Sequence, residues 1–559
     1  MGRAVFPARK GFSARIVEQV NVIEGDETVR ARQFRIPPRD FTKAYLDGCL
    51  GQFFSEGLPC PEHLLAVARR AGERQIRHRA AVSRALVRFQ REIGADGLAE
   101  RAAAQLAEDG TVAVVTGQQA GLFTGPLYTV YKALTAVALA DWLSGEGYRA
   151  VPVFWVASED DDWSEMSACH VPGEGGENVS LRAEAPERAM PSGMLPALLA
   201  APAVDGLIQH LRGARYLSQV QATVHRAYSD GTLAFAFARM MADLTRETGL
   251  VMLDPMLEEL RAESLPVFRA LLCQAKAVSD ALSKTSALLS ARGYVPGVHK
   301  KENAVLAFLM TDDGRQSLEH YDGQVVSSGG YRALAVHLVA EAERSPGLLG
   351  TNALSRPLVQ DYLLPTAVYV SGPSELRYLA QLGGIYELLG LQRGVIYPRC
   401  SVTLVEPALA RYMEKYGVLD SDIPYGIKEA FTRFIRSGRA LSVTERLCAL
   451  RQTLRATYED LGPLMAELGL SDLHLRNMER IASEIDWFET RVIRAFAELE
   501  KRAKTHFERL QNSLFPDGCL QERKLNITYF LAKYGPDIIQ EMKVLLRLGK
   551  PGEHMIIDL

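Results

Sequence analysis

The chain has 559 residues, which is more than a single hydrophobic core usually supports, so we expect more than one domain. Its 47% hydrophobic and 23% charged residues are typical of a globular protein, and a formal net charge of −3 gives no overall attraction to nucleic acid or to an anionic membrane. Seven scattered cysteines without a C-x-x-C pair indicate reduced thiols in the cytosol rather than a disulfide framework or a zinc site. Residues 1–17 lack the apolar core of a signal peptide, and no uncharged run is long enough to cross a bilayer.

The first informative segment is TVAVVTGQQAGLFTGPLYTVYK, residues 111–132. Its apolar run Val112–Val115 predicts a strand, which leads into a turn with three glycines at intervals of four residues: Gly117, Gly121 and Gly125. Pro126 then opens a predicted helix. A strand, a glycine-rich turn and a helix N-terminus are typical of an anion site, although the turn matches neither a dinucleotide-binding nor a P-loop pattern. Tight packing of strand on helix is the alternative interpretation.

The helix after Pro126 has one apolar face, and Lys132 lies off that face. Lys132 is therefore either a solvated lysine or a cation that serves the glycine turn.

A second apolar run, Val151–Val156, is followed by an acidic cluster: Glu159, Asp160, Asp161, Asp162 and Glu165. Ligands of open α/β sheets bind beyond the carboxyl ends of the strands, so the cluster and the glycine turn should lie close together. We expect Asp160 and Asp162, before Asp161, to bind Mg2+ or a substrate ammonium group. A solvated acidic loop is the alternative.

Five short apolar runs without polar alternation predict a parallel sheet that is covered on both faces: Val112–Val115, Val151–Val156, Leu250–Leu253, Ala367–Val370 and Val395–Tyr397. The segments between them are long enough for helical crossovers, so the predicted fold is a doubly wound α/β core over residues 1–404. Helical insertions are expected at about 165–248 and 256–345.

The fourth run ends in SGPSE, residues 371–375, where a Gly-Pro pair again opens a predicted helix. Ser371, Gly372 and Ser374 are candidates to bind an anion there, and ordinary helix capping is the alternative role of Ser374. Arg399, after the fifth run, is a candidate to hold a carboxylate or phosphate, or to form a structural salt bridge.

Residues 405–513 are predicted to form a helical coiled-coil arm. Two apolar series at spacings of three and four, from Leu447 to Leu468 and from Ile481 to Leu499, are separated by a break near residues 469–472. This pattern predicts an antiparallel helical hairpin, and its length favours a protruding arm that forms a homodimer. A helical lid folded on its own core is the alternative. Residues 514–559 should return to the core.

Four segments resemble, in order, the cysteine-adding enzyme family of bacillithiol biosynthesis: residues 116–132, Val151–Trp163, Arg356–Leu382 and Leu514–Asp537. The resemblance implies a bacterial cytoplasmic ligase that joins cysteine to glucosaminyl-malate, with a Rossmann-like core and a coiled coil. Amide formation at neutral pH requires an activated carboxyl group, so ATP or another nucleotide is the expected activator, with Mg2+ as a further candidate at Asp160 and Asp162.

The residues that match the family pattern are Gly117, Gln118, Gln119, Gly125, Lys132, Glu159 and Asp160. Many members have histidine where Tyr131 and Asp161 stand. Lys132, Asp160 and Asp162 are the expected catalytic residues. Nucleotide or another anion is expected at Gly117, Gln118, Gln119, Gly125, Ser371 and Gly372. The substrate is expected at Glu159, Ser374 and Arg399. A further segment that resembles the family contains His299, Asn303 and Arg315, for which structural roles are the alternative.

Two other functions fit the same sequence features. One is a non-catalytic dimeric scaffold with a nucleotide-type pocket, and the other is a nucleotidyltransferase-like ligase for a different amino acid. Isotope exchange into ATP that depends on cysteine would separate a ligase from a scaffold, and another amino acid that drives exchange better would favour the second alternative.

Overall fold

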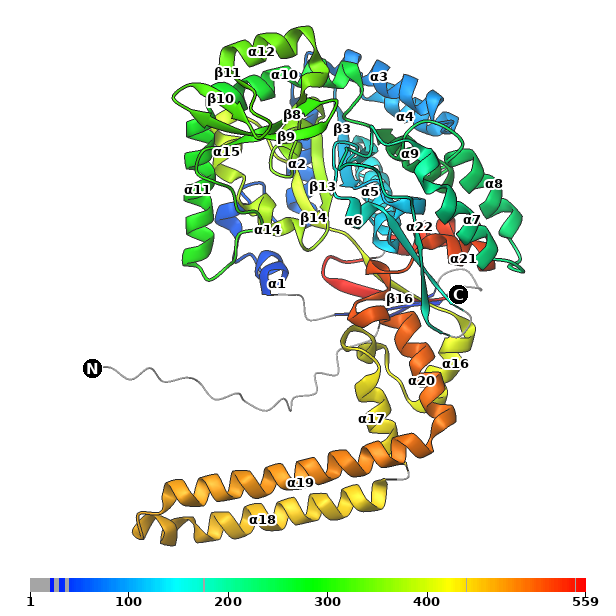
Figure 1. Ribbon diagram of the computed structural model, residues 1–559, viewed down its shortest axis with the longest axis vertical. Helices are drawn as coiled ribbons and strands as arrows, with labels where there is room; N and C mark the ends of the chain where they lie inside the picture. The colour runs from blue at the N-terminus through cyan, green and yellow to red at the C-terminus, as the bar shows by residue number, and fades with distance from the viewer. Residues whose placement is uncertain (1–20, 25–29, 36–39, 174–175, 439, 548) are drawn as a thin grey trace.

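The computed structural model describes residues 21–24, 30–35, 40–173, 176–438, 440–547 and 549–559; the segment 1–17 assessed above for a signal peptide lies outside them. Figure 1 shows an α/β body from which a long helical arm projects. Among the described residues, no helix has the length and apolar character needed to cross a membrane.

The centre of the body is a five-stranded sheet whose strands are all parallel. Its order is β14-β13-β3-β4-β7, with β3 Thr111–Gln118, β4 Arg149–Val156, β7 Val251–Leu253, β13 Thr366–Ser371 and β14 Val395–Pro398. Each of the five predicted runs is a strand of this sheet, so the predicted doubly wound core is confirmed. The chain adds strands outward from β3 on one side and from β13 on the other. The order therefore reverses between these two strands, which is where ligands bind in such sheets.

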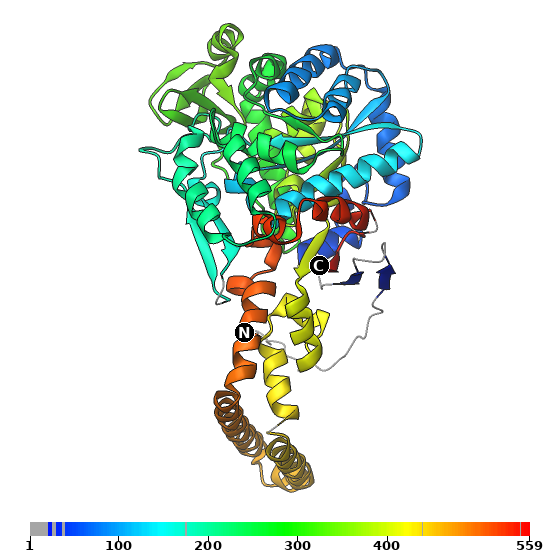
Figure 2. The same cartoon turned by 90° about the vertical axis from the view of Figure 1, so that its right-hand side faces the viewer.

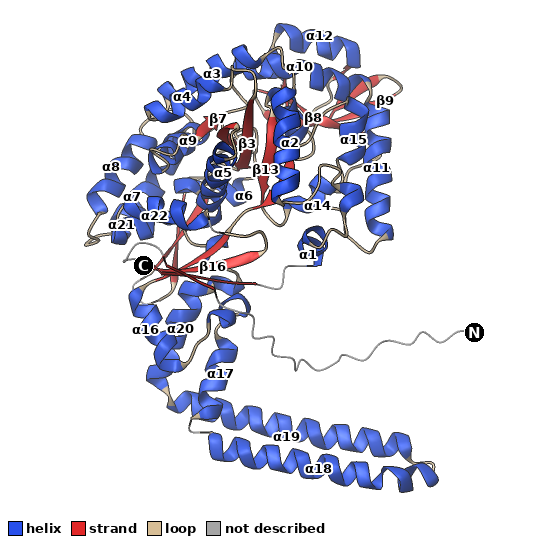
Figure 3. Ribbon diagram, turned by 180° about the vertical axis from the view of Figure 1, so that it is seen from behind, coloured by secondary structure: helices blue, strands red, loops and turns tan. Residues whose placement is uncertain are grey.

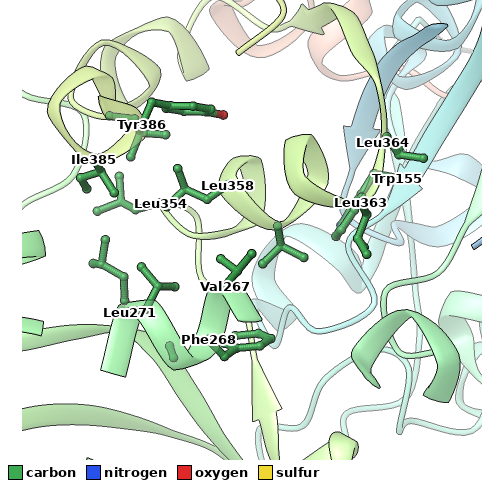
Figure 4. Packing of buried hydrophobic residues seen from close by; sticks show 14 of the residues in the cluster. Trp155, Val267, Phe268, Leu271, Leu354, Leu358, Leu363, Leu364, Ile385 and Tyr386 are labelled. Carbon is green, nitrogen blue, oxygen red and sulfur yellow. The ribbon is translucent and has the colours of Figure 1, made fainter. Parts of the chain in front are cut away.

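Helices cover both faces of the sheet (Figure 3). One face packs on α2 Pro61–Glu73, α5 Leu127–Gly145 and α9 Leu233–Leu244, and the other on α3 Arg79–Glu92, α4 Gly97–Gln105, α10 Glu258–Cys273 and α13 Arg356–Leu363. Within β3, Val114 contributes to the first core and Val115 to the second, which explains the lack of polar alternation. Figure 4 shows the second core, where Trp155 of β4 belongs to the same cluster as Phe268 of α10 and Leu363 of α13.

Two insertions interrupt the sheet. The first contains α6 Trp163–Met166, the hairpin β5 Ala168–Pro172 and β6 Asn178–Arg182, α7 Ala201–His210, α8 Leu217–Ala227 and α9. The second contains α10, α11 Ala275–Ala291, α12 Ala335–Arg344 and a sheet built from β8 Ala304–Thr311, β9 Gly314–Tyr321, β10 Gln324–Ser327 and β11 Arg332–Leu334, with β12 Leu349–Gly350 at its edge. The expected helices are present in both insertions, but the strands within the insertions were not predicted. The apolar run of β8 cannot be distinguished from a buried helix by periodicity, and β9 is largely polar.

A four-stranded mixed sheet joins the body to the arm. The chain leaves β14 through Arg399 and Cys400 and enters β15 Ser401–Val405, which pairs with the C-terminal strand β16 Glu553–Asp558. The order continues through β2 Arg30–Arg35 to β1 Asn21–Glu24. Segments from both ends of the described chain therefore meet beside the central sheet.

The arm is a pair of long helices, α18 Leu441–Glu467 and α19 Ser471–Leu499, joined by a turn at Gly469. They lie side by side and extend away from the body (Figures 1 and 2), so the alternative of a lid on the core is wrong. At its base stand α16 Pro407–Tyr416, α17 Lys428–Ser437 and α20 Lys501–Leu514, from which the chain returns to the body as α21 Ile527–Tyr534 and α22 Asp537–Leu546.

The returning segment holds the glycine turn. Asn526 donates from Nδ2 to the carbonyls of Phe123 (2.9 Å) and Gly125 (2.6 Å), and the Leu127 amide donates to the Leu525 carbonyl (2.8 Å). The helix begins at Leu127, so Pro126 is its cap rather than its first residue. The backbone at Phe123, Thr124 and Gly125 has positive φ, a conformation that two of these residues adopt only because the surroundings impose it.

We predict that Asn526→Ala destabilises the protein by about 2–5 kcal/mol, because two buried carbonyls lose their donor. Urea unfolding followed by circular dichroism measures the change. The exposed Gln452→Ala on the arm is the matched control and should shift stability by less than about 0.5 kcal/mol. Equal midpoints for the two variants would contradict the role of Asn526.

Candidate functional site

A cavity of about 490 Å³ opens at the carboxyl ends of β3, β4 and β13, where the strand order reverses. The volume suits a small-molecule ligand. Nine of the twelve nominated residues line it: Gly117, Gln118, Gln119, Lys132, Glu159, Asp160, Gly372, Ser374 and Arg399. Gly125, Asp162 and Ser371 do not. The topology therefore brings most of the sequence-predicted residues to one place.

Lys132 lies at the floor of this cavity with only 3% of its surface exposed. Its ammonium group donates to the Gly117 carbonyl (2.9 Å), to Gln118 Oε1 (2.9 Å) and to Glu375 Oε2 (2.6 Å). All three N–H bonds are thereby used. Burial lowers the pKa of Lys132, and the neighbouring carboxylate of Glu375 opposes that change. Lys132 is thus a buried member of an ion pair and not a solvated lysine.

The side chain of Glu375 binds the backbone amide of the second predicted anion turn, which follows β13. Its Oε2 accepts the Gly372 N–H (2.6 Å), while Oε1 accepts the hydroxyls of Tyr369 and Tyr378 (both 2.8 Å). Burial alone would raise the pKa of Glu375, but the charge of Lys132 and its other donors lower it to about 2. The carboxylate of Glu375 is therefore the anion that this turn binds, and the carboxylate remains ionised at neutral pH.

The acidic loop after β4 is tied to the second insertion. Arg315 of β9 donates to Asp160 Oδ1 (2.8 Å) and also to Asp161, while Gln119 donates to Asp160 Oδ2 (2.7 Å). Arg315 was a weak candidate from sequence. It lies 155 residues after Asp160, and no sequence pattern indicates that the two side chains are in contact. Asp161, at one of the two departures from the family pattern, thus contributes to holding Arg315.

Glu159 makes a second tie to the same insertion. It is buried, forms an ion pair with Arg261 of α10 (3.4 Å), and accepts the Thr351 amide (3.0 Å) and hydroxyl. Asp162 instead caps α6 by accepting the Ser164 amide (3.1 Å). Asp160 and Asp162 therefore have separate partners. In the part of the chain that the structure describes, no group of three or more His, Cys, Asp or Glu side chains is arranged to hold a metal ion.

Arg399 is also buried in an ion pair, with two bonds to Glu522 of 2.9 and 2.6 Å. Glu522 further accepts the Val402 amide (3.0 Å), so the pair fixes the step from β14 to β15. Tyr131, the other departure from the family pattern, is fully buried and does not line the cavity.

The turn residues outside the cavity have backbone partners. The Gly125 amide donates to the Leu122 carbonyl (2.8 Å), and the Ser371 carbonyl accepts the Arg399 amide (2.9 Å). The expected use of free amides at Gly125 therefore has no support in this geometry. The φ of Gly117 is not positive and Gly117 belongs to β3, but an added Cβ would lie 2.9 Å from the Trp155 carbonyl oxygen. Glycine is required there by the close approach of two strands.

The lining charges divide into paired and unpaired groups. Lys132, Arg315 and Arg399 are paired with carboxylates, and so are Glu159, Asp160 and Glu375. Among the described residues, three lining cations form no ion pair: Lys300, Arg356 and Arg523. Among the described residues, Glu165 is the lining carboxylate that forms no ion pair. Three unpaired cations against one unpaired carboxylate favour a ligand with several negative charges and one amino group.

Sequence reasoning missed all three unpaired cations. Arg356 and Arg523 lie inside segments that resemble the family, which was the available signal, but neither belongs to a motif with a recognisable mechanism. Lys300 reaches the cavity from the connection between α11 and β8. Tyr369 and Tyr378, which hold Glu375, were equally hidden within the pattern of a strand and a helix.

Two family models match the chain along nearly its whole length. "Bacillithiol biosynthesis BshC, N-terminal Rossmann-like domain" matches residues 32–400, and "Bacillithiol biosynthesis BshC, C-terminal coiled-coil domain" matches residues 402–559. Curated relatives from Salinibacter ruber, Symbiobacterium thermophilum and Heliobacterium modesticaldum carry the name "Putative cysteine ligase BshC". They are 34%, 33% and 32% identical to this chain, over 86%, 86% and 88% of its length and 92%, 90% and 92% of theirs.

We predict that Glu375→Gln costs about 3–5 kcal/mol at pH 7, because Lys132 stays buried without its partner. The double variant Lys132→Met/Glu375→Gln should recover most of this loss, since it removes both charges. The pKa of Glu375 is depressed from 4.5 to about 2, so its ionised form stabilises the fold above pH 4.5 and this contribution disappears as the pH falls toward 2.

Urea unfolding between pH 2.5 and 7 measures both effects. The stability difference between the wild-type protein and Glu375→Gln should shrink below pH 4.5. A difference that stays constant with pH, or a double variant no more stable than the single one, would contradict the buried pair.

Proposed function

The chain belongs to the bacillithiol biosynthesis BshC family, and we propose that it is the ligase that joins cysteine to glucosaminyl-malate. The family match over both domains is the observation that carries the proposal. The cavity supports it, because its lining combines several cations with a free carboxylate at the ligand-binding edge of the sheet. The reduced cysteines fit a cytosolic location, since all seven are free.

The acceptor's chemistry matches the unpaired charges. Glucosaminyl-malate carries two carboxylates and one amino group, and a nucleotide that activates cysteine adds phosphates. We assign these anions to Lys300, Arg356 and Arg523, because Lys132 and Arg399 are already neutralised by internal carboxylates. Arg356 is held for this role by its bonds to Gln360 (2.7 Å) and to the hydroxyl of Tyr369 (2.9 Å).

The paired residues would organise the cavity rather than bind substrate through their charge alone. Lys132 fixes the end of β3 against the turn after β13, and Asp160 and Glu159 fix the second insertion over the opening. These contacts would hold cysteine and the acceptor in the orientation that amide formation requires. ATP or another nucleotide would supply the leaving group on the cysteine carboxyl. Mg2+ would arrive on its phosphates, with Asp160 as the nearest candidate ligand.

We also propose that two chains pair through the arm. Within α18, Leu447 is buried. By contrast, four leucines of α18 and its cap are 41–59% exposed: Leu450, Leu461, Leu464 and Leu468. Such a row of exposed leucines on a two-helix hairpin suits burial against a second copy.

Loss of the gene should abolish bacillithiol, or a methylated relative of it, and should make glucosaminyl-malate accumulate. Mass spectrometry of labelled low-molecular-weight thiols in the source bacterium measures both. We predict that wild-type protein restores the thiol, while Asp160→Asn at equal protein level lowers its rate of formation by about tenfold or more, because Arg315 loses a charged partner.

Asp313→Asn is the matched control, because Asp313 lies next to β9 but is exposed and pairs with Arg188 outside the cavity. Full restoration is expected from it. An unchanged thiol profile in the deletion strain would contradict the proposed function. Isotope exchange into ATP driven by serine rather than cysteine would favour a ligase for another amino acid.

The paired substitution Leu464→Glu/Leu468→Glu should convert the dimer to a monomer, because it places charge in the proposed seam. Light scattering coupled to gel filtration measures the mass of each species. Glu467→Gln, an exposed neighbour, is the control and should leave the mass unchanged. A monomeric wild-type protein at micromolar concentration would contradict the dimer.

A further inference from the structure

Glu165 is the carboxylate on the cavity wall that no internal ion pair among the described residues neutralises. It lies on the short helix α6, three residues after the cap Asp162, and no ion pair among the described residues includes it. The charged and titratable groups that face it are Asp160 and Asp162 from its own loop, Arg523 from the C-terminal segment and Tyr128 from α5. Gln119, after β3, donates a hydrogen bond to it.

The other lining carboxylates are unsuited to receive a proton. Glu375 accepts four hydrogen bonds and has its pKa lowered to about 2. Asp160 accepts hydrogen bonds from Arg315 and Gln119. Glu159 accepts a hydrogen bond from Thr351 and forms an ion pair with Arg261. Burial and the charges of Asp162 and Asp160 instead raise the pKa of Glu165. Geometry and charge thus leave this carboxylate free for a ligand.

Amide formation makes a specific demand on such a group. An amine is mostly an ammonium ion at neutral pH, and only its deprotonated form can attack a carbonyl carbon. A carboxylate that first binds the ammonium and then takes its proton meets both needs.

We propose that Glu165 binds the amino group of the acceptor sugar and acts as the base that deprotonates it. This inference rests on the proposed ligase function. The ammonium gives one proton to Glu165, and the freed lone pair forms the C–N bond with the activated cysteine carboxyl. The C–O bond to the activating phosphate group then breaks, its oxygen keeps the electron pair, and the second N–H proton leaves to water.

Binding measurements test the first half of the proposal without turnover. Isothermal titration at pH 7 compares glucosaminyl-malate with its N-acetyl derivative, which has the same shape at the sugar and carboxylates but no basic amine. Glu165→Gln should weaken binding of the amine by about tenfold, and binding of the N-acetyl compound by less than about threefold. Glu165→Asp should keep part of the preference for the amine. Glu146→Gln, at the exposed far end of α5, is the matched control and should change neither.

Equal weakening of both ligands, or loss of cysteine binding instead, would overturn the assignment to the sugar amine. In cells that lack the gene, Glu165→Gln should leave the acceptor unconsumed while Glu146→Gln restores the thiol, and full restoration by Glu165→Gln would overturn the role as base. If the wild-type protein binds neither sugar ligand and deletion leaves bacillithiol unchanged, the proposed function itself fails, and the inference falls with it.

Discussion

The ion pair between Lys132 and Glu375 is the interaction on which the candidate site depends. It joins the helix that follows β3 to the turn that follows β13, across the point where the strand order reverses. Burying two charges is costly unless each finds its full set of hydrogen-bond partners. Here the lysine has three acceptors and the glutamate has four donors, so the floor of the cavity is fixed in one arrangement.

The same principle shapes the rest of the cavity wall. Arg399 with Glu522, Arg315 with Asp160, and Arg261 with Glu159 each join segments that are distant in sequence. Each pair satisfies charges internally and thereby removes them from ligand binding. Among the described residues, three cations and one carboxylate of the cavity wall form no ion pair and can meet a ligand. The other charged side chains of the wall are neutralised by the protein itself. A site of this kind separates the residues that maintain geometry from those that meet the ligand.

The central sheet could be predicted from sequence because all five strands are short, continuous apolar runs with glycine or proline nearby. The arm could be predicted equally well, since its leucines repeat at helical spacing. The nine nominated residues that line the cavity followed from two signals, the convergence of strand ends and the match to the family pattern. Their partners did not follow, because Arg315, Tyr369 and Glu522 reach the site through insertions and packing that no local pattern encodes. For the same reason, Lys132 was recognisable as important but not as internally neutralised. For Arg399 a structural salt bridge was the stated alternative, and the structure shows that salt bridge with Glu522.

The path of the chain has a consequence for how the protein is made. Asn526 holds a turn whose residues lie about 400 positions earlier, and the last strand, β16, stands between β2 and β15. On the ribosome, the N-terminal parts of the sheet emerge first and can begin to pack, but the glycine turn lacks its hydrogen-bond partners until the segment around Asn526 leaves the exit tunnel. The nascent chain must therefore carry an incomplete glycine turn, next to the candidate site, while the roughly 400 residues between the turn and Asn526 are synthesised. A prematurely terminated product would retain most of the core yet lack the residues that close it.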